Sequence, residues 1–212
     1  METLIRKGAE ADIYKVRWNG LIAIKKIRLP KLYRQPSLDE ELRKRRTIHE
    51  ATLISAAKFA GVNSPLLYFL DKSDYSIYME HFDGPRIKDV LDDPDLGTTK
   101  IFEAVGRSIG SLHRENIIHG DLTTSNFILI ADGGLGLIDF GLSFRSNRLE
   151  DKAVDLHLVK QTLESAHSAV ADEMFTDLID GYRRISGEES TNRIKSIMRQ
   201  VERRGRCPVG LE

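Results

Sequence analysis

Asp121, Asn126 and Asp139 carry three oxygen-bearing side chains that stand around one predicted hairpin. Two apolar runs flank Asp132-Gly133, and Asp-Gly between such runs predicts a two-residue turn. Asn126 would then face Asp139 across the open end of the hairpin, with Asp121 one short loop upstream. Magnesium takes oxygen ligands, usually one or two from the protein together with phosphate oxygens. The spacing therefore predicts a metal–phosphate site with Asn126 and Asp139 as ligands, and Asp121 as a base that holds a hydroxyl or a water.

The alternative is a surface hairpin in which Asp and Asn serve only as turn formers. The spacing argues against this alternative. Asp-Leu-x-x-x-Asn at residues 121–126 is followed by Asp-Phe-Gly at residues 139–141, and this combination is the catalytic signature of protein kinases. Unlike a lone glycine motif, it is specific.

The bulk properties of the chain limit its class. Its 212 residues are 41% hydrophobic, which is enough for one sizeable core or two small lobes. The 32 basic and 32 acidic residues cancel, so no global field favours nucleic acid or a membrane. The only cysteine, Cys207, excludes an intrachain disulfide framework, and neither a membrane-spanning run nor a signal-peptide pattern is present. We therefore expect a cytoplasmic protein without a membrane contact.

Residues 3–29 predict short strands that are interrupted at Lys7–Ala11. Small residues at that interruption would let the backbone approach a phosphate. Since the stretch contains only one glycine, an ordinary hairpin is the alternative. Lys25 and Lys26 end the following apolar strand, where one of them could pair with nucleotide phosphates or both could mark an exposed strand end.

The first long helix is predicted over residues 37–60, with a capping box at residues 37–40 and Gly61 as its stop. Glu50 falls on the apolar stripe of this helix, and a buried carboxylate is costly unless it is paired. One of the two lysines is the expected partner, as in the Lys–Glu ion pair of kinases. The alternative places Glu50 at the solvated edge of the stripe. The basic run Arg43–Arg46 is expected to be a solvated face, with a docking surface for an acidic partner or RNA as the alternative.

Two further strands, at residues 66–70 and 75–79, lead into Glu80–Gly84. In a kinase this segment is the hinge, whose backbone binds adenine, and Met79 would limit the depth of the adenine pocket. From Pro85 onward the pattern is helical. His113 adjoins an apolar helix face and is expected to be a satisfied core histidine rather than a ligand. Helices are predicted over residues 99–115, 151–169, 174–182 and 190–201.

Several kinase features are altered, and the alterations form a pattern. The usual His-Arg-Asp is His119-Gly120-Asp121, Thr123 replaces the lysine two residues after the catalytic Asp, and only a short segment without Ala-Pro-Glu follows Asp-Phe-Gly. With these features the chain resembles the small atypical kinase family of the KEOPS (EKC) complex over essentially its whole length. The motifs that carry the resemblance are Gly8-Ala9-Glu10-Ala11, Lys26-x-Arg28-x-Pro30-Lys31-x-Tyr33-Arg34, Arg46-Thr47-x-x-Glu50-Ala51, Tyr78-Met79-Glu80, His119–Asn126, Ile138–Ser143, Glu150–Leu156 and Arg204-Gly205-Arg206.

The resemblance implies an α+β, bilobal protein-kinase-like fold. Residues 1–82 would form a β-rich N-lobe with the hinge, residues 83–201 a helical C-lobe, and residues 202–212 a flexible basic tail. The family spacing to Tyr33-Arg34 also selects Lys26 over Lys25. The implied site residues are Asp121 and Lys26 in catalysis, Gly8, Ala9, Glu10, Ala11, Lys26, Glu50, Glu80 and Phe82 at the nucleotide, and Asn126 and Asp139 at the metal.

The activity that the resemblance implies is that of an ATP- and Mg²⁺-dependent atypical Ser/Thr protein kinase or ATPase. It would support threonylcarbamoyladenosine formation in tRNA as a KEOPS subunit. The implied partners are the catalytic threonylcarbamoyl-transferase subunit, a small regulatory subunit and, indirectly, tRNA. Two alternatives are a free-standing Ser/Thr kinase, which the missing activation segment disfavours, and a non-catalytic assembly module, which Lys26, Asp121, Asn126 and Asp139 disfavour.

Overall fold

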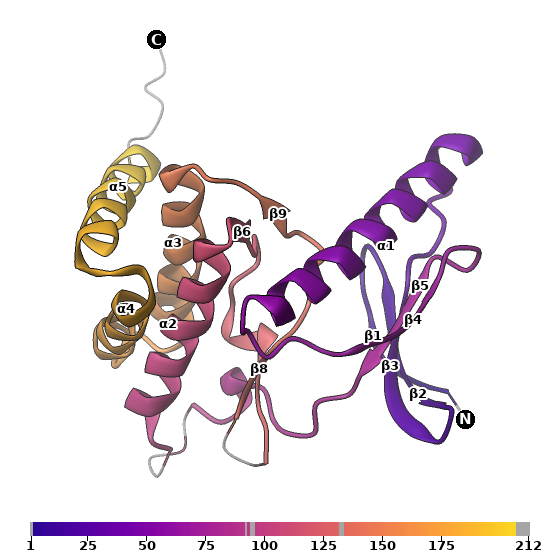
Figure 1. Cartoon of the computed structure of the whole chain (residues 1–212), viewed down its shortest axis with the longest axis horizontal. Coiled ribbons are helices and arrows are strands. Elements are labelled where there is room, and N and C mark those ends of the chain that lie inside the picture. The colour runs from indigo at the N-terminus through magenta and orange to yellow at the C-terminus, as the bar shows by residue number, and fades with distance from the viewer. Residues whose placement is uncertain (1, 92, 94–95, 132–133, 207–212) are drawn as a thin grey trace.

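The computed structural model of the protein describes residues 2–91, 93, 96–131 and 134–206. A five-stranded sheet with a long helix beside it forms the N-terminal part, and a body of helices forms the C-terminal part (Figure 1). Short strand pairs lie between the two. The fold is therefore α+β, as predicted.

The N-terminal sheet is antiparallel throughout. Its strands are β1 (Thr3–Lys7), β2 (Asp12–Trp18), β3 (Leu21–Ile27), β4 (Leu67–Asp71) and β5 (Ser76–Glu80), in the order β1-β2-β3-β5-β4. A two-residue turn joins β2 to β3. Asn19 and Gly20 form it with φ values of 46° and 85°, as a type I′ hairpin requires. Because side chains alternate along a strand, Lys25 and Lys26 of β3 face opposite sides of the sheet.

Helix α1 (Pro36–Phe59) lies beside this sheet and contacts β4 and β5 (Figure 1). It begins at a proline, and its N-cap residue, Gln35, makes no side-chain cap. The predicted capping box is therefore wrong, because Ser37 already lies inside the helix. Proline suits the first turn, where its fixed φ fits and its missing N–H has no partner to lose. The end of the helix is as predicted, since Gly61 follows it in the left-handed region with φ 84°.

Short elements connect the sheet to the helical body. They are η1 (Ile87–Asp89), β6 (Ile117–Ile118), η2 (Thr124–Asn126), β7 (Phe127–Leu129), β8 (Leu135–Leu137) and β9 (Phe144–Arg145). Strand β6 pairs with β9, and β7 pairs with β8.

The register of the β7–β8 hairpin differs from the prediction by one residue. The N–H of Ile138 donates to the carbonyl of Asn126 over 2.9 Å, so Asn126 faces Ile138 and not Asp139. The N–H of Ile130 donates to the carbonyl of Gly134, in the same register as the pairing of Phe127 with Leu137. The predicted turn residues, Asp132-Gly133, lie outside the described residues.

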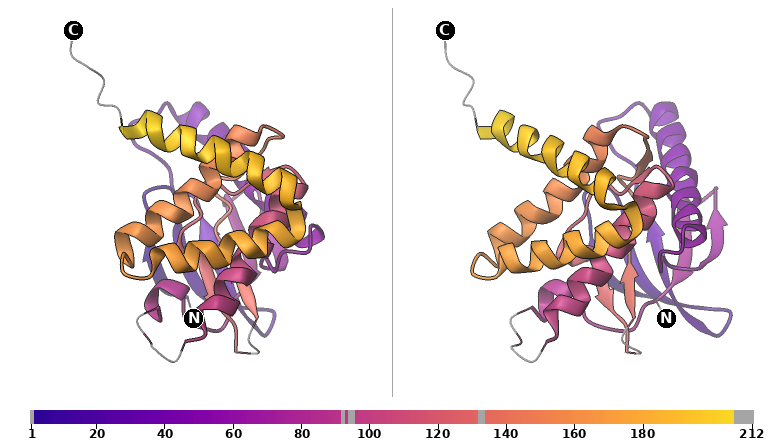
Figure 2. Two further views of the ribbon diagram at one scale, coloured as in Figure 1. Left: turned by 90° about the vertical axis from the view of Figure 1, so that its left-hand side faces the viewer. Right: turned by 60° about the vertical axis from the view of Figure 1, so that its left-hand side comes forward.

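The helical body is seen from its outer side in Figure 2. It consists of α2 (Thr98–Arg114), α3 (Leu149–Ala166), α4 (Ala171–Ser186) and α5 (Glu188–Arg206). Helices α2 and α4 approach closely because each has a glycine at the contact. A Cβ on Gly106 would lie 1.9 Å from the carbonyl oxygen of Leu178, and one on Gly181 would lie 2.0 Å from that of Glu103. Larger residues at either position would force these helices apart.

Helix α5 continues to Arg206, five residues beyond the predicted end of the last helix at residue 201. The Glu202 carboxylate accepts a hydrogen bond from Lys160 of α3 over 2.8 Å, which joins this part of α5 to the helical body. The rest of the expected tail, residues 207–212, lies outside the described residues.

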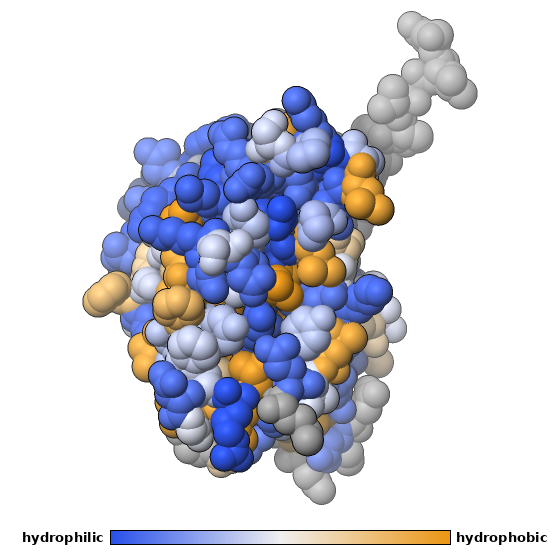
Figure 3. Space-filling view, turned by 90° about the vertical axis from the view of Figure 1, so that its right-hand side faces the viewer, coloured by the Kyte–Doolittle hydropathy of each residue, from blue (hydrophilic) through white to orange (hydrophobic). Residues whose placement is uncertain are grey.

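Apolar side chains on the outer face of the N-terminal part are scattered among polar ones in Figure 3. Isolated exposed apolar residues of this kind are ordinary on protein surfaces. Within the described part of the chain, no helix has both the length and the apolar character needed to cross a membrane.

Candidate active site

A chain of ion pairs centred on Lys26 links the sheet, α1 and the segment after β8. The Lys26 ammonium lies 2.5 Å from a carboxylate oxygen of Glu50 and 2.7 Å from one of Asp139. Lys26 and Glu50 are both buried, so Glu50 is not at a solvated edge of the stripe. Lys25 faces the other side of the sheet and pairs with Asp74 over 3.1 Å. Lys26, not Lys25, is therefore the partner of Glu50.

Arg28 is a member of this chain that the sequence prediction did not include among its site residues. Its guanidinium binds the second carboxylate oxygen of Glu50 over 2.5 Å and is itself buried. Two cations therefore share one buried carboxylate. The available signal was the position of Arg28, two residues after Lys26, which places both side chains on the same face of the chain.

The electrostatics favour the charged forms of these groups. Burial opposes the charge on Lys26, but the carboxylates of Glu50 and Asp139 outweigh it and raise the lysine pKa. Burial likewise opposes ionisation of Asp139, yet the Lys26 ammonium and the Gly141 N–H keep the pKa of that carboxyl below its usual value. Both partners are therefore ionised at neutral pH.

Asp121 and Asn126 form a second pair beside the first. The Asn126 side-chain amide donates to the Asp121 carboxylate over 2.9 Å and to its backbone carbonyl over 2.8 Å. Asp139 lies just beyond the β7–β8 ladder with φ 66°, in the left-handed region that non-glycine residues rarely adopt. Strain of this kind is typical of functional sites. The three predicted residues are thus close together, although Asn126 does not pair directly with Asp139.

Asp155 of α3 holds the loop that carries Asp121. Its carboxylate accepts the backbone N–H groups of His119 and Gly120, each over 2.8 Å. His113 contacts the same carboxylate over 3.1 Å and the Tyr182 hydroxyl over 3.0 Å, so it is the satisfied core histidine that was predicted. Asp155 was not singled out as a site residue from the sequence. The usable signal was a carboxylate on the buried stripe of a helix, the same signal that identified Glu50.

The buried His119 imidazole links the Asp121 loop to the segment after β8. Its imidazole contacts the Ile138 carbonyl over 3.2 Å, accepts the Asp121 N–H over 3.4 Å, and packs edge-on against Phe140. Burial lowers the pKa of His119 and outweighs the nearby carboxylates, which act in the opposite direction. The ring is therefore neutral at neutral pH and fixes both the Asp121 loop and the segment after β8.

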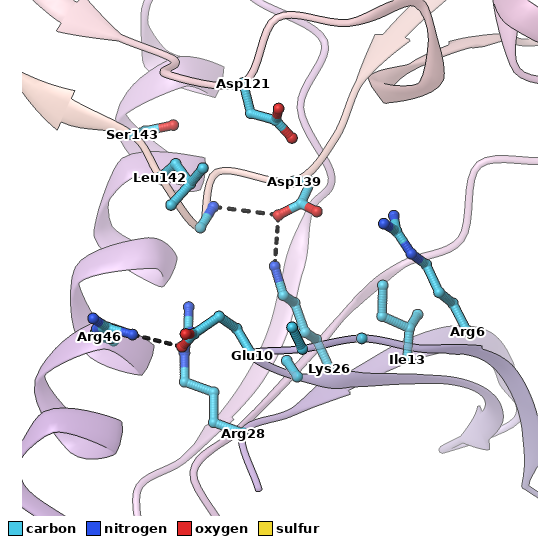
Figure 4. A pocket seen from close by; sticks show the side chains of 14 residues that line it. Arg6, Glu10, Ile13, Lys26, Arg28, Arg46, Asp121, Asp139, Leu142 and Ser143 are labelled. Carbon is cyan, nitrogen blue, oxygen red and sulfur yellow. Dashed lines mark hydrogen bonds and ion pairs between the residues drawn. The ribbon is translucent and has the colours of Figure 1, made fainter. Parts of the chain in front are cut away.

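Two adjoining cavities open onto these residues. The larger, of about 490 Å³, is polar and is lined by Asp121, by Gly141–Ser143 and by the Gly8–Ala11 loop (Figure 4). The smaller, of about 230 Å³, lies against the hinge. Arg6, Ile13, Lys26 and Asp139 line both cavities. The apolar lining of the smaller cavity includes Ile5, Ile13, Ile24, Met79, Ile128 and Ile138.

The predicted nucleotide residues are distributed between the two cavities. Gly8–Ala11 lines the larger one, and Glu80, Phe82 and Asn126 line the smaller. The Phe82 ring is buried against β8, where a Cβ on Gly136 would come within 2.5 Å of it. Its side chain is therefore structural, and a contact from the hinge to a ligand would come from the backbone. Glu50 lines neither cavity and acts on the site through Lys26 and Arg28, which do line the larger one.

The Gly8–Ala11 loop is anchored to its surroundings. Glu10 pairs with Arg46 of α1 over 2.5 Å (Figure 4). Lys31 donates to the carbonyl of Ala9. A Cβ on Gly8 would lie 2.5 Å from the carbonyl oxygen of Ala11, so the loop needs glycine at this position. The basic run Arg43–Arg46 of α1 thus contributes Arg46 to the loop contact.

The donor set suits Mg²⁺ in the company of phosphate. Among the described residues, no group of three or more His, Cys, Asp or Glu side chains could hold a metal by itself. Mg²⁺ commonly takes one or two protein oxygens and completes its shell with phosphate and water. The Asp139 carboxylate and the Asn126 amide are hard oxygen ligands beside a polar cavity, so they fit that arrangement.

Known proteins with similar sequences show the family of this chain. The protein kinase domain model matches residues 2–182. The KEOPS complex subunit Bud32 of Pyrococcus abyssi is 41% identical over 96% of this chain and 95% of its own length. Probable bifunctional tRNA threonylcarbamoyladenosine biosynthesis proteins of Methanothermobacter thermautotrophicus and Methanobrevibacter smithii are 42% and 40% identical, and this chain spans 36% and 37% of their lengths. The chain therefore belongs to the protein kinase domain family and, within it, to the family of the KEOPS complex subunit Bud32.

Proposed function

We propose that this protein binds Mg²⁺ and ATP between its sheet and its helical body and transfers the terminal phosphoryl group to a Ser/Thr hydroxyl or to water. The observation that carries the proposal is that two adjoining cavities are lined by the Lys26 ammonium and the Asp121 carboxylate, each held in place by neighbouring side chains. Lys26 is held by Glu50 and Asp139, and Asp121 is held by Asn126. An apolar cavity suited to a base adjoins a polar one suited to phosphates.

Each residue has a separate task in this proposal. Lys26 contacts the nucleotide phosphates, and Glu50 fixes its position. Asp139 and Asn126 hold Mg²⁺, which neutralises phosphate charge when bound. Asp121 accepts a hydrogen bond from the attacking hydroxyl and orients it, a contribution typically worth about 10²–10⁴ in rate. The backbone of Glu80 and Phe82 faces the base, and the Gly8–Ala11 loop covers the phosphates.

Two features support slow turnover rather than efficient phosphorylation of many substrates. Thr123 stands where kinases place a lysine against the transferring phosphate, so charge stabilisation is weaker. Strand β9 ends at Arg145 and α3 begins at Leu149, which leaves no segment to form a peptide-docking platform. Self-phosphorylation and ATP hydrolysis therefore fit this chain better than the activity of a free-standing kinase.

The proposed setting is the KEOPS complex and the threonylcarbamoyladenosine modification of tRNA in the cytoplasm. The Pyrococcus relative, which matches along nearly its whole length, is named as a KEOPS subunit. In the bifunctional relatives, a segment like this chain is part of a longer polypeptide named for that tRNA modification. Fusion of two units favours a partnership between them, so we infer that the partners are the catalytic threonylcarbamoyl-transferase subunit and a small regulatory subunit.

The test is to measure Mg²⁺-dependent ATP turnover by the protein alone, and then with these subunits and tRNA. We expect slow turnover alone and a larger rate in the full mixture, where tRNA modification also depends on the protein. Asp121→Asn is the matched variant. It is nearly isosteric and can still accept the hydrogen bond from Asn126, but it removes the negative charge. Full turnover and modification with Asp121→Asn would contradict the catalytic proposal, whereas modification without any turnover would favour an assembly module.

A further inference from the structure

We propose that Arg6 is a phosphate-binding residue of this site and supplies, from the sheet, a positive charge that Thr123 does not provide from the catalytic loop. The inference rests on the proposed function, because it concerns a contact to the same nucleotide. Arg6 is not one of the predicted site residues. The argument comes from its register, its neighbours and the cavities that it lines.

The pairing of β1 with β2 turns Arg6 toward the cleft. Arg6 lies opposite Ile13, and directly opposed residues of antiparallel strands share a face of the sheet. Ile13 lines both cavities, so Arg6 is on the cavity side. The register also shifts between Leu4 and Arg6, which makes Ile5 an extra residue in β1. Bulges of this kind re-aim side chains next to active sites, and here Ile5 and Arg6 both line the smaller cavity.

Arg6 differs in its ion pairing from the other cations of the larger cavity. Lys26 and Arg28 share Glu50, and Arg46 pairs with Glu10. Arg6 has neither a hydrogen bond nor an ion pair to any side chain in the described part of the protein. Its side chain extends from β1 into the space beside Asp139 in Figure 4. An exposed guanidinium that points into a cleft without an internal partner is available to an anionic ligand.

The position of Arg6 matches the phosphate part of a nucleotide. It lines both cavities together with Asp139, the proposed metal ligand, so its guanidinium lies in the part of the cleft where Mg²⁺ and the terminal phosphates, which AMP lacks, would be held. Guanidinium binds phosphate oxygens through two parallel N–H groups, which adds geometry to charge. In the kinase pattern G-x-G-x-x-G-x-V, Gly8 at the second glycine puts Arg6 at the first and Ile13 at the valine. A glycine there contributes only backbone, whereas this chain adds a cation.

Binding of ATP, ADP and AMP in the presence of Mg²⁺ tests the assignment by calorimetry. Arg6→Gln should weaken ATP binding by about tenfold or more, because a charged hydrogen bond is lost, and leave AMP binding nearly unchanged. Lys7→Gln is the matched control, since Lys7 is the adjacent exposed cation and lines neither cavity. Arg6→Lys should recover part of the lost affinity. Thr123→Lys added to Arg6→Gln should restore turnover by supplying the charge from the opposite side.

Three results would overturn the assignment. ATP affinity of Arg6→Gln equal to that of Lys7→Gln would show that the guanidinium makes no phosphate contact. Equal losses for ATP and AMP would show that it acts on the base or on the loop. An Arg6→Gln protein with a lower melting temperature than Lys7→Gln would show a structural role. Failure of the proposed function is a distinct result, because the unaltered protein would then bind neither ATP nor ADP.

Discussion

Glu50 shows how a single buried carboxylate organises this site. It is about 1% exposed and receives both Lys26 and Arg28, so removal of one cation does not leave it wholly unpaired. Lys26 in turn connects it to Asp139. The position of the lysine is therefore fixed before any nucleotide arrives, which is the preorganisation that an electrostatic site requires.

The two neighbouring lysines should respond differently to removal. Lys26→Ala leaves Glu50 and Asp139 short of a buried partner, and we expect a loss of about 3 kcal/mol in the free energy of unfolding. Lys25→Ala breaks a more exposed pair with Asp74 and should cost about 0–1 kcal/mol. Urea unfolding of both variants, with ATP turnover measured in parallel, checks this difference. If both variants lost the same amount of turnover, the assignment of Lys26 as the phosphate-binding lysine would be wrong.

Asp139 should be needed for turnover but not for folding. Asp139→Ala removes the proposed metal ligand, while Lys26 keeps its contact with Glu50. We expect turnover to fall by about 10²-fold or more, with a melting temperature close to that of the unaltered protein. Asp74→Ala, which removes the other aspartate of a lysine pair, is the control and should retain activity. Normal Mg²⁺-dependent turnover in Asp139→Ala would contradict the site assignment.

The buried imidazole of His119 should make stability depend on pH. Its folded pKa is below the ordinary value of 6.5, so between these two values the unfolded chain binds more protons than the folded one. The free energy of unfolding should therefore decrease as the pH falls below 6.5, by at most about 1.4 kcal/mol per pH unit for this group. Asp139 and Asp155, whose pKa values are lowered from 3.8, lose their contribution only at more acidic pH.

Urea unfolding at pH 7.5 and pH 5.5 measures this slope. His81 also has a lowered pKa, because of burial and then of Lys15, and contributes in the same range. The comparison is therefore best made in a His81→Asn background, with and without His119→Asn. The second substitution should reduce the slope. An unchanged slope would mean that His119 is already charged in the folded protein.

Among the helices and strands, the features that could be predicted from the sequence are those that follow from hydrophobic periodicity and from the cost of burying a charge. The apolar stripe of α1 and a carboxylate upon it required a cation nearby, and the Lys–Glu pair followed. The register of the β7–β8 hairpin could not be predicted in the same way, because it depends on whether two or three residues form the loop, and the hydrophobic pattern around 131–133 is compatible with both. The first residue of α1 was predicted wrongly for a similar local reason. Ser37 fits a capping box, whereas Pro36 fits the first helical position, and the sequence alone does not decide between them.

Contacts between distant side chains were the least predictable part of the site. The spacing from Lys26 places Arg28 on the same face of the chain, but only the packing of α1 beside β3 shows that its long side chain reaches Glu50. Asp155 lies on a helix 35 residues after the Gly120 backbone N–H that it accepts. The sequence thus identified the groups with chemistry, while tertiary packing decided which of them support one another. The catalytic and ligand roles of these residues stay predictions.

For the whole molecule, the end of α5 divides the C-terminal region into two parts. Truncation after Arg206 removes no described contact and should leave the melting temperature unchanged. Truncation after Val201 removes Glu202 from Lys160 and should lower it by about 1–3 °C. By the family resemblance, the longer truncation, which removes Arg204-Gly205-Arg206, should slow tRNA modification in the reconstituted complex while ATP binding by the protein alone is retained. Modification at the full rate by this truncated protein would discard a role for the tail.

The burial of Phe140 has a consequence for inhibitor chemistry. Its ring is fully buried and lies edge-on against the His119 ring, with 4.9 Å between the ring centroids. A compound that enters by displacing this phenylalanine would have to break this buried packing before gaining any contact. Compounds confined to the hinge cavity face no such barrier, and an acidic group on them could reach Arg6 at its mouth. Selectivity against ordinary kinases, which have glycine at that position of the loop, should therefore come from anionic substituents rather than from depth.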